Sequence, residues 1–146
     1  MSTAQSKFFA DPSGVSVTIE TSGRTIRPMM EIPARLVDEA ELTFDADGLH
    51  SAAVDPANVG MYELHARPEA FESYAVDGDE LTIGVNVNRL QSSLSDARLG
   101  KSTDDPVDLD IDGTRTLVGI EREYDTTTLA RTDELLNLEP ESMRER

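Results

Sequence analysis

One acidic segment of the chain has the spacing of a metal-binding loop. Residues 108–113 read DLDIDG, which matches the opening of a calcium loop in which carboxylates take alternate positions. Such a loop also needs a bidentate carboxylate at its twelfth position, and that position is Gly119 here. Since the aspartates alternate with apolar residues, we predict the solvent-exposed face of a strand and no calcium site.

The two histidines, His50 and His65, are the next residues that could do chemistry. Nothing in their spacing brings them together with a nucleophile or with further ligands, so we expect two half-exposed strand residues. The chain has no cysteine, no phosphate-cradling glycine loop, no nucleophile elbow and no HExxH. We therefore predict a protein that is not an enzyme, with no cofactor and no metal.

The basic residues form a more informative pattern. Five of the thirteen fall on or beside two predicted helices, namely Arg24, Arg27, Arg89, Arg98 and Lys101. If both helices cover one face of a sheet, these side chains form a basic patch that can contact phosphates without reading sequence. The alternative, which composition alone favours, is ordinary solvated helix faces with local ion pairs such as Arg27 with Glu31.

Length and charge limit the class of protein. The chain has 146 residues and a net charge of -16, from 13 Lys and Arg against 29 Asp and Glu. This balance argues against general, charge-driven binding to nucleic acid. The acid excess is spread along the chain, which indicates a folded acidic surface; a saline cytoplasm explains it better than an acidic mesophilic protein does. We expect no membrane span and no secretion signal, because no apolar run is long enough.

The elements that must position these residues follow from periodicity. Alternating apolar residues predict about eight short strands. The first helix carries Ile26, Met29 and Met30 on one face and should end at Pro33. The second begins at a capping Asn86 and carries Leu90, Leu94 and Ala97. Short strands that follow one another, interrupted by only two short helices, predict an α+β domain with antiparallel sheets and the two helices on one face.

Several segments, in order and in spacing, resemble the archaeal sliding clamps, the homologues of proliferating cell nuclear antigen. The strongest is residues 48–61, GLHSAAVDPANVGM, and the others are residues 36–39, 71–74, 83–90, 114–117 and 124–130. The resemblance spans about residues 16 to 145 and is best to haloarchaeal clamps. It implies one clamp domain of two βαβββ-like units at 16–132, a flexible arm at 1–15, and an acidic, Arg-ending tail at 133–146 that matches the start of the interdomain connector.

The resemblance also implies how copies would assemble. Clamps of this family have two such domains per subunit and three subunits per ring, whereas this chain matches the N-terminal domain only. A single-domain chain could therefore form a head-to-tail ring of six copies. The resemblance places the pairing edges at 71–76 and 116–122, with contacts from Phe71, Ser73, Tyr74, Val76, Thr116, Leu117, Val118 and Ile120.

Several functions are compatible with this resemblance. The first is a DNA-encircling ring that acts as a processivity or tethering factor on double-stranded DNA in a halophilic archaeal cytoplasm, encoded by the cell, a virus or a plasmid. The alternatives are a clamp-derived structural ring or adaptor, for example viral, and a decoy that binds the edge of a host clamp. Replication proteins are the further partners that the resemblance implies.

Overall fold

The computed structural model describes residues 14–54, 60–95, 105–123 and 126–138. Its strands are β1 (Ser16–Ser22), β2 (Glu39–Asp45), β3 (Gly48–Val54), β4 (Met61–Ala66), β5 (Ser73–Asp77), β6 (Glu80–Asn86), β7 (Pro106–Asp112), β8 (Arg115–Glu123) and β9 (Thr128–Leu136). The helices are α2 (Gly23–Leu36), α3 (Val87–Leu94) and a single 3-10 turn, η1 (Pro68–Ala70). The predicted α+β class is confirmed.

Two antiparallel sheets carry the domain, one with the strand order β5-β1-β7-β8-β9 and one with the order β4-β3-β2-β6. The chain contains two βαβββ units, β1-α2-β2-β3-β4 and β6-α3-β7-β8-β9, with β5 between them. Each unit gives its first strand to the sheet of the other: β1 pairs with β7, and β6 pairs with β2. This exchange makes the two units one folded body.

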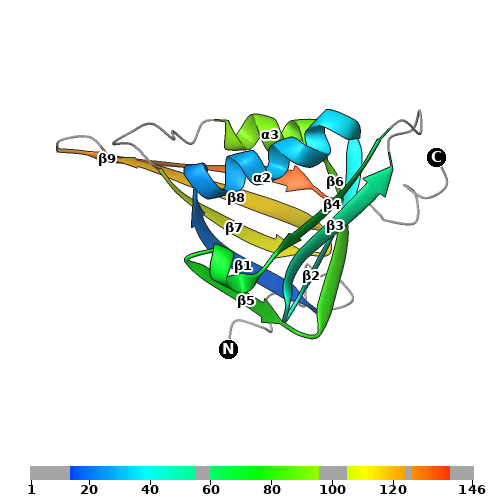
Figure 1. Cartoon of the computed structure of the whole chain (residues 1–146). Helices are drawn as coiled ribbons and strands as arrows, with labels where there is room; N and C mark the ends of the chain where they lie inside the picture. Colours follow the sequence, from blue (N-terminus) through cyan, green and yellow to red (C-terminus); the bar gives the residue numbers. More distant parts are fainter. Residues whose placement is uncertain (1–13, 55–59, 96–104, 124–125, 139–146) are drawn as a thin grey trace.

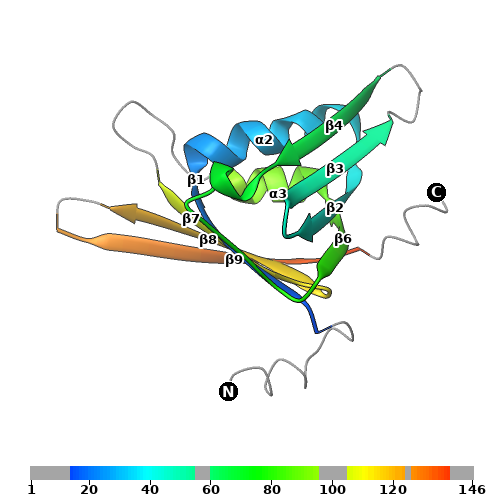
Figure 2. The ribbon, with the colours of Figure 1, turned by 60° about the horizontal axis from the view of Figure 1, so that its bottom comes forward.

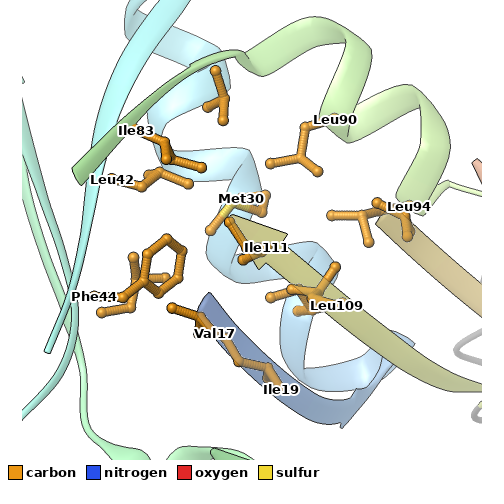
Figure 3. Close-up of a cluster of buried hydrophobic side chains, with 14 of the residues drawn as sticks. Val17, Ile19, Met30, Leu42, Phe44, Ile83, Leu90, Leu94, Leu109 and Ile111 are labelled. Carbon is orange, nitrogen blue, oxygen red and sulfur yellow. The ribbon is translucent and has the colours of Figure 1, made fainter. Parts of the chain in front are cut away.

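The core lies between the sheets and the two helices. Val17 and Ile19 of β1, Phe44 of β2 and Ile83 of β6 are almost fully buried, as is Leu94 of α3. Figure 3 shows these side chains converging from both sheets and from α3. The side chains from β1 and β2 come from alternate positions of each strand, so residues with period-two spacing in the sequence are the buried ones.

Helix α2 is longer than predicted. Ile26 and Met30 are buried as expected, but the helix runs through Pro33 to Leu36. Proline removes only one backbone donor, and Pro33 lies in the last turns, where its carbonyl accepts the amide of Val37 at 2.9 Å. The Pro33 ring is itself buried, so packing compensates for the lost hydrogen bond.

The predicted boundary at residue 132 is also too early. Strand β9 pairs with β8 as far as Leu136, and Leu135 is buried in the core. The chain then crosses to the other sheet, where Leu138 exchanges two backbone hydrogen bonds with Gly84 of β6, at 2.8 and 3.0 Å. We call Asn137 and Leu138 the strap, because they tie the end of β9 to the four-stranded sheet. The proposed arm at 1–15 lies almost entirely outside the described residues.

Candidate nucleic-acid interface and sheet edges

Helices α2 and α3 contact each other and lie in one layer on the same side of the domain, as Figures 1 and 2 show. Helix α3 begins as predicted: the Asn86 side chain accepts the amide of Arg89 at 3.0 Å. The apolar faces of both helices point into the core. Their other faces are therefore turned outward together.

The outward faces carry three of the five predicted basic residues. Arg24 of α2 and Arg89 of α3 are exposed, and Arg27 of α2 is half-buried. The other two, Arg98 and Lys101, lie outside the described residues. The structure thus brings Arg24, Arg27 and Arg89 onto one helix layer, which is the arrangement that a basic patch requires.

Sequence reasoning missed one member of this layer. Arg35 is exposed in the last turn of α2, on the same outward face as Arg24 and the exposed Glu31. It was overlooked because Pro33 was expected to end the helix before it. The helical spacing from Arg24 to Arg35, about three turns, was the signal that could have found it.

The two histidines meet on the outer face of the four-stranded sheet. His50 and His65 are cross-strand partners of β3 and β4, and their rings stack with centroids 4.3 Å apart. His50 Nε2 lies 3.1 Å from Asp45 Oδ1. Burial tends to raise the pKa of Asp45, but hydrogen bonds from the Asp47 amide and from His50 outweigh burial and lower it. Both histidines lie on strands as predicted, whereas the contact between them was not predicted.

The DLDIDG segment lies on strand β7, as predicted. Asp108 and Asp110 occupy exposed positions of β7, while the apolar residues between them are buried. Burial and the nearby carboxylates of Glu20 and Glu121 raise the pKa of Asp108. No group of three or more metal-ligating side chains occurs within the described ranges. This outer face is acidic, in contrast to the helix layer.

One of the two predicted pairing edges, residues 71–76, does lie at the edge of a sheet. Strand β5 is the outermost strand of the five-stranded sheet, next to β1. The aromatic side chains predicted to make contacts there are turned inward: Phe71 is buried in the core, and the Tyr74 hydroxyl donates to the Asp45 carbonyl at 2.7 Å. Val76 also packs against the core, and Ser73 is half-buried. Only the backbone of β5 is available for pairing.

The prediction that residues 116–122 form the other pairing edge is wrong. Strand β8 lies between β7 and β9, and β9 pairs with it along its whole length, from Arg115 to Glu123. Its alternate side chains belong to the core: Thr116, Val118 and Ile120 are buried, and Leu117 is half-buried. The residues that cover β8 include 133–136, which the prediction assigned to a tail.

In addition to β5, two further terminal strands among those described have an open outer edge, β9 and β4. Strand β9 ends the five-stranded sheet, and β4 ends the four-stranded sheet. The fourth terminal strand, β6, is covered at Gly84 by the strap. Of these open edges, those of β9 and β4 carry exposed large apolar side chains, Leu136 on β9 and Met61 on β4. Apolar side chains beside an unpaired edge are typical of a strand-pairing interface.

Comparison with known proteins connects these features to a family. The sequence profile described as "Proliferating cell nuclear antigen, N-terminal domain" matches residues 20–120, more than half of the chain. The chain belongs to the proliferating cell nuclear antigen family. A "DNA polymerase sliding clamp" of Haloarcula marismortui is 42% identical over 91 residues, which cover 62% of this chain and 34% of the relative. Its counterpart in Archaeoglobus fulgidus is 36% identical over 101 residues, covering 69% and 39%.

Solved structures agree with the sequence match. The structure titled "C-terminal region of FEN-1 bound to A. fulgidus PCNA" superposes with a TM-score of 0.74 at 27% identity, over 89% of this chain and 48% of that one. The Thermococcus kodakaraensis PCNA superposes with a TM-score of 0.72 at 22% identity, over 85% and 47%. The chain thus spans about a third to a half of the length of the proteins that it matches. No helix in the described part of the chain has the length and hydropathy of a membrane span.

Proposed function

We propose that the chain is a clamp-like protein that assembles into a ring around double-stranded DNA and acts as a tethering or processivity factor. The observation that carries the proposal is the one helix layer with its outward arginines, flanked by two open strand edges on different sheets. A head-to-tail contact needs two different edges, and a closed series of such contacts makes a ring.

The ring would be closed by β9 of one copy pairing with β4 of the next. Helix α3 contacts β9, and α2 contacts β4, so this pairing keeps the helices of successive copies in one layer. The exposed Leu136 of β9 and Met61 of β4 would then become buried near the joint. The chain contributes one clamp domain, and the rings that it resembles contain six, so we propose six copies per ring.

The helix layer would face the DNA, with Arg24, Arg27 and Arg89 as loose phosphate contacts and Arg35 as a fourth. Arg98 and Lys101 come after α3 in the sequence, and we propose the same role for them. In concentrated salt such contacts contribute little affinity, because counterion release is suppressed. Enclosure of the DNA, rather than affinity, would therefore hold the ring in place.

Retention on circular DNA tests this function. The variant with Arg27, Arg89 and Arg98 all changed to Glu should assemble like the wild type but be lost from nicked circular DNA in a spin column. A control that changes Arg67, an exposed arginine next to η1, to Glu should be retained. Retention of the triple variant at the wild-type level would contradict the proposed DNA contacts.

Linear DNA separates enclosure from adhesion. A ring held by topology should slide off linear DNA whose ends are free, whereas a protein held by charge should stay bound on both forms. Equal retention on linear and circular DNA would favour a different use of the clamp fold, such as a structural adaptor. Assembly only in the presence of a host clamp would favour the decoy.

The remaining expectations belong to the same proposal. The protein would act without catalysis, in the saline cytoplasm of a haloarchaeal cell. Replication enzymes are proposed as partners, because the similar A. fulgidus protein is described in complex with the C-terminal region of FEN-1. A halophilic source is supported by the acidic composition and by the identity to the Haloarcula protein.

A further inference from the structure

A polar hollow of about 390 Å³ lies on the outer face of the four-stranded sheet, where β2, β3 and β4 run side by side. Its polar lining consists mainly of two histidines, two glutamates and a threonine, namely His50, His65, Glu41, Glu63 and Thr43. The buried side chains of the same strands belong to the core beneath the helices. The hollow therefore lies on the opposite side of the sheet from the helix layer.

Hydrogen bonds show which nitrogen of each histidine carries a proton. His50 Nε2 lies 3.1 Å from a carboxylate oxygen of Asp45, and His65 Nε2 lies 3.0 Å from the backbone carbonyl oxygen of Asp47. A carboxylate and a carbonyl can only accept, so Nε2 donates in both rings. In a neutral imidazole the other nitrogen then has a lone pair, so each Nδ1 is an acceptor.

The two rings form one unit. His50 and His65 are cross-strand partners, and their rings stack with centroids 4.3 Å apart and planes inclined by 16°. Each ring is also tied by its Nε2 hydrogen bond to the segment that joins β2 and β3. The stack is thus held from two sides, and it brings two acceptor nitrogens to the same part of the sheet.

The glutamates add negative charge beside the stack. Glu63 lies two residues before His65 on β4, and Glu41 lies two residues before Thr43 on β2, so both side chains share the face of the histidines. The cross-strand partner of Glu63 is Ala52, which is exposed and lines the hollow. Its methyl group is too small to fill the space in front of the carboxylate.

This combination of groups selects the class of ligand. Acceptors and negative charge call for a cation that donates hydrogen bonds. A metal ion is not favoured, because within the described ranges no three metal-ligating side chains converge. An ammonium is a compact point charge, whereas a guanidinium spreads five N–H donors over a plane and stacks on aromatic rings. A guanidinium is therefore the cation that can reach separated acceptors while lying against an imidazole.

The openness of the hollow indicates how the guanidinium arrives. A site for a free small molecule buries most of the surface of its ligand. Here His65, Glu63 and Ala52 are all exposed, so the hollow can cover only one group of a ligand. A side chain presented by a larger partner meets this condition, because the partner supplies further contacts from its own surface.

We propose that this hollow receives an arginine side chain of a partner protein, with the guanidinium beside Glu63 and against the histidine stack. The inference goes beyond the proposed function, since neither the ring nor the DNA contacts require it. It makes the outer face of the four-stranded sheet a protein-binding surface that stays accessible while the helix layer faces DNA.

The test is a titration with acetyl-arginine amide, followed through the ring-proton NMR signals of His50 and His65. Concentrated salt screens general attraction to the acidic surface, so binding that remains reports the hollow. Both histidines should shift and saturate together. Acetyl-lysine amide should bind several-fold more weakly, because its ammonium lacks the planar set of donors. A blocked Gly-Gly-Arg-Gly-Gly peptide should bind at least as tightly as acetyl-arginine amide.

Four variants locate the binding. Glu63→Gln should weaken it by about tenfold, as expected for the loss of one charge-assisted hydrogen bond. Ala52→Leu should block the hollow without changing the charge, and His65→Phe should weaken binding because it keeps a ring over His50 but removes an acceptor. The matched control is Glu121→Gln, which removes an exposed carboxylate from the other sheet and should bind like the wild type.

Each other outcome overturns the inference. Histidine signals that do not saturate would show that the hollow is not a site, and equal binding of the lysine compound would remove guanidinium recognition. A blocked peptide that binds more weakly than acetyl-arginine amide would make the ligand a small molecule. Equal effects of Glu63→Gln and Glu121→Gln would assign the binding to general surface charge. A fall in assembly mass in Glu63→Gln would make an arginine of a second copy the occupant.

Discussion

The strap makes the sharpest prediction about stability. The Asn137 side chain donates from Nδ2 to the Asp112 carbonyl at 2.7 Å and accepts from the Thr116 hydroxyl at 2.9 Å. Its backbone amide separately donates to the Thr114 carbonyl at 2.8 Å. The change Asn137→Ala removes the two side-chain hydrogen bonds and leaves the backbone bond in place.

The size of the effect follows from burial. Thr116 is only 3% exposed, so its hydroxyl loses its partner where water has little access. An unsatisfied buried donor costs about 1–3 kcal/mol, and an ordinary hydrogen bond contributes about 1 kcal/mol. Because Asp112 is half-buried, its carbonyl can recover part of its bond from water. We expect Asn137→Ala to lower the free energy of unfolding by about 2–4 kcal/mol.

Urea unfolding in concentrated salt, followed by circular dichroism, measures this loss. The matched control is Asn88→Ala, which removes a long 3.4 Å contact between Asn88 Nδ2 and Asp38 Oδ1 on the exposed surface. The control should change the free energy of unfolding by less than about 0.5 kcal/mol. If Asn137→Ala destabilises no more than the control does, the Asn137 side chain does not anchor the strap to the end of β7 and the start of β8.

Three further predictions concern the sheets. Burial and the Glu20 carboxylate raise the pKa of Asp108, so the contribution of Asp108 to the stability of the fold falls as pH rises. Asp108→Asn should therefore raise the urea midpoint at neutral pH, and the increase should shrink as added salt screens the repulsion between the carboxylates. Burial and the Asp45 carboxylate raise the pKa of Tyr74 to about 12. The contribution of Tyr74 to stability should therefore be lost as pH rises from about 10 to about 12, and Tm should fall over this range. In Tyr74→Phe, Tm should depend less on pH over the same range. Gly48→Ala should lower Tm sharply, since its φ is +120° and an added Cβ would fall 2.1 Å from a backbone oxygen; an unchanged Tm would contradict the turn geometry.

The strands were predictable from the sequence because their burial has period two. Alternation at Val17 and Ile19, or at Leu109 and Ile111, requires only that one face of a strand be buried. The asparagine cap of α3 was predictable for the same local reason. Each of these features depends on residues that are close in sequence.

The errors have a common physical origin in tertiary packing. Pro33 ends an isolated helix, but here its buried ring keeps it in α2. The residues two positions before and after Leu135 are polar, so the end of β9 shows no alternating apolar pattern. It is a strand because it pairs with β8. The contact between His50 and His65 depends on the register of β3 against β4, which no local pattern specifies.

The candidate site was predictable in part for the same reasons. Arg24, Arg27 and Arg89 were found from helical spacing, because the apolar face of each helix fixes the opposite face. Arg35 was missed because it lies beyond Pro33, where the first helix was expected to end. An error in an element boundary therefore removed a residue from the site, just as the early domain boundary removed the end of β9 from the fold.

The mass of the assembly in concentrated salt tests the central claim most directly. Sedimentation equilibrium of the wild type should give about six times the 16.0 kDa chain mass. The exposed-edge variant Leu136→Asp should shift that mass toward the single chain, since the 71% exposed side chain plays little part in the fold of one copy. A wild type that stays at 16.0 kDa at every concentration would contradict the ring.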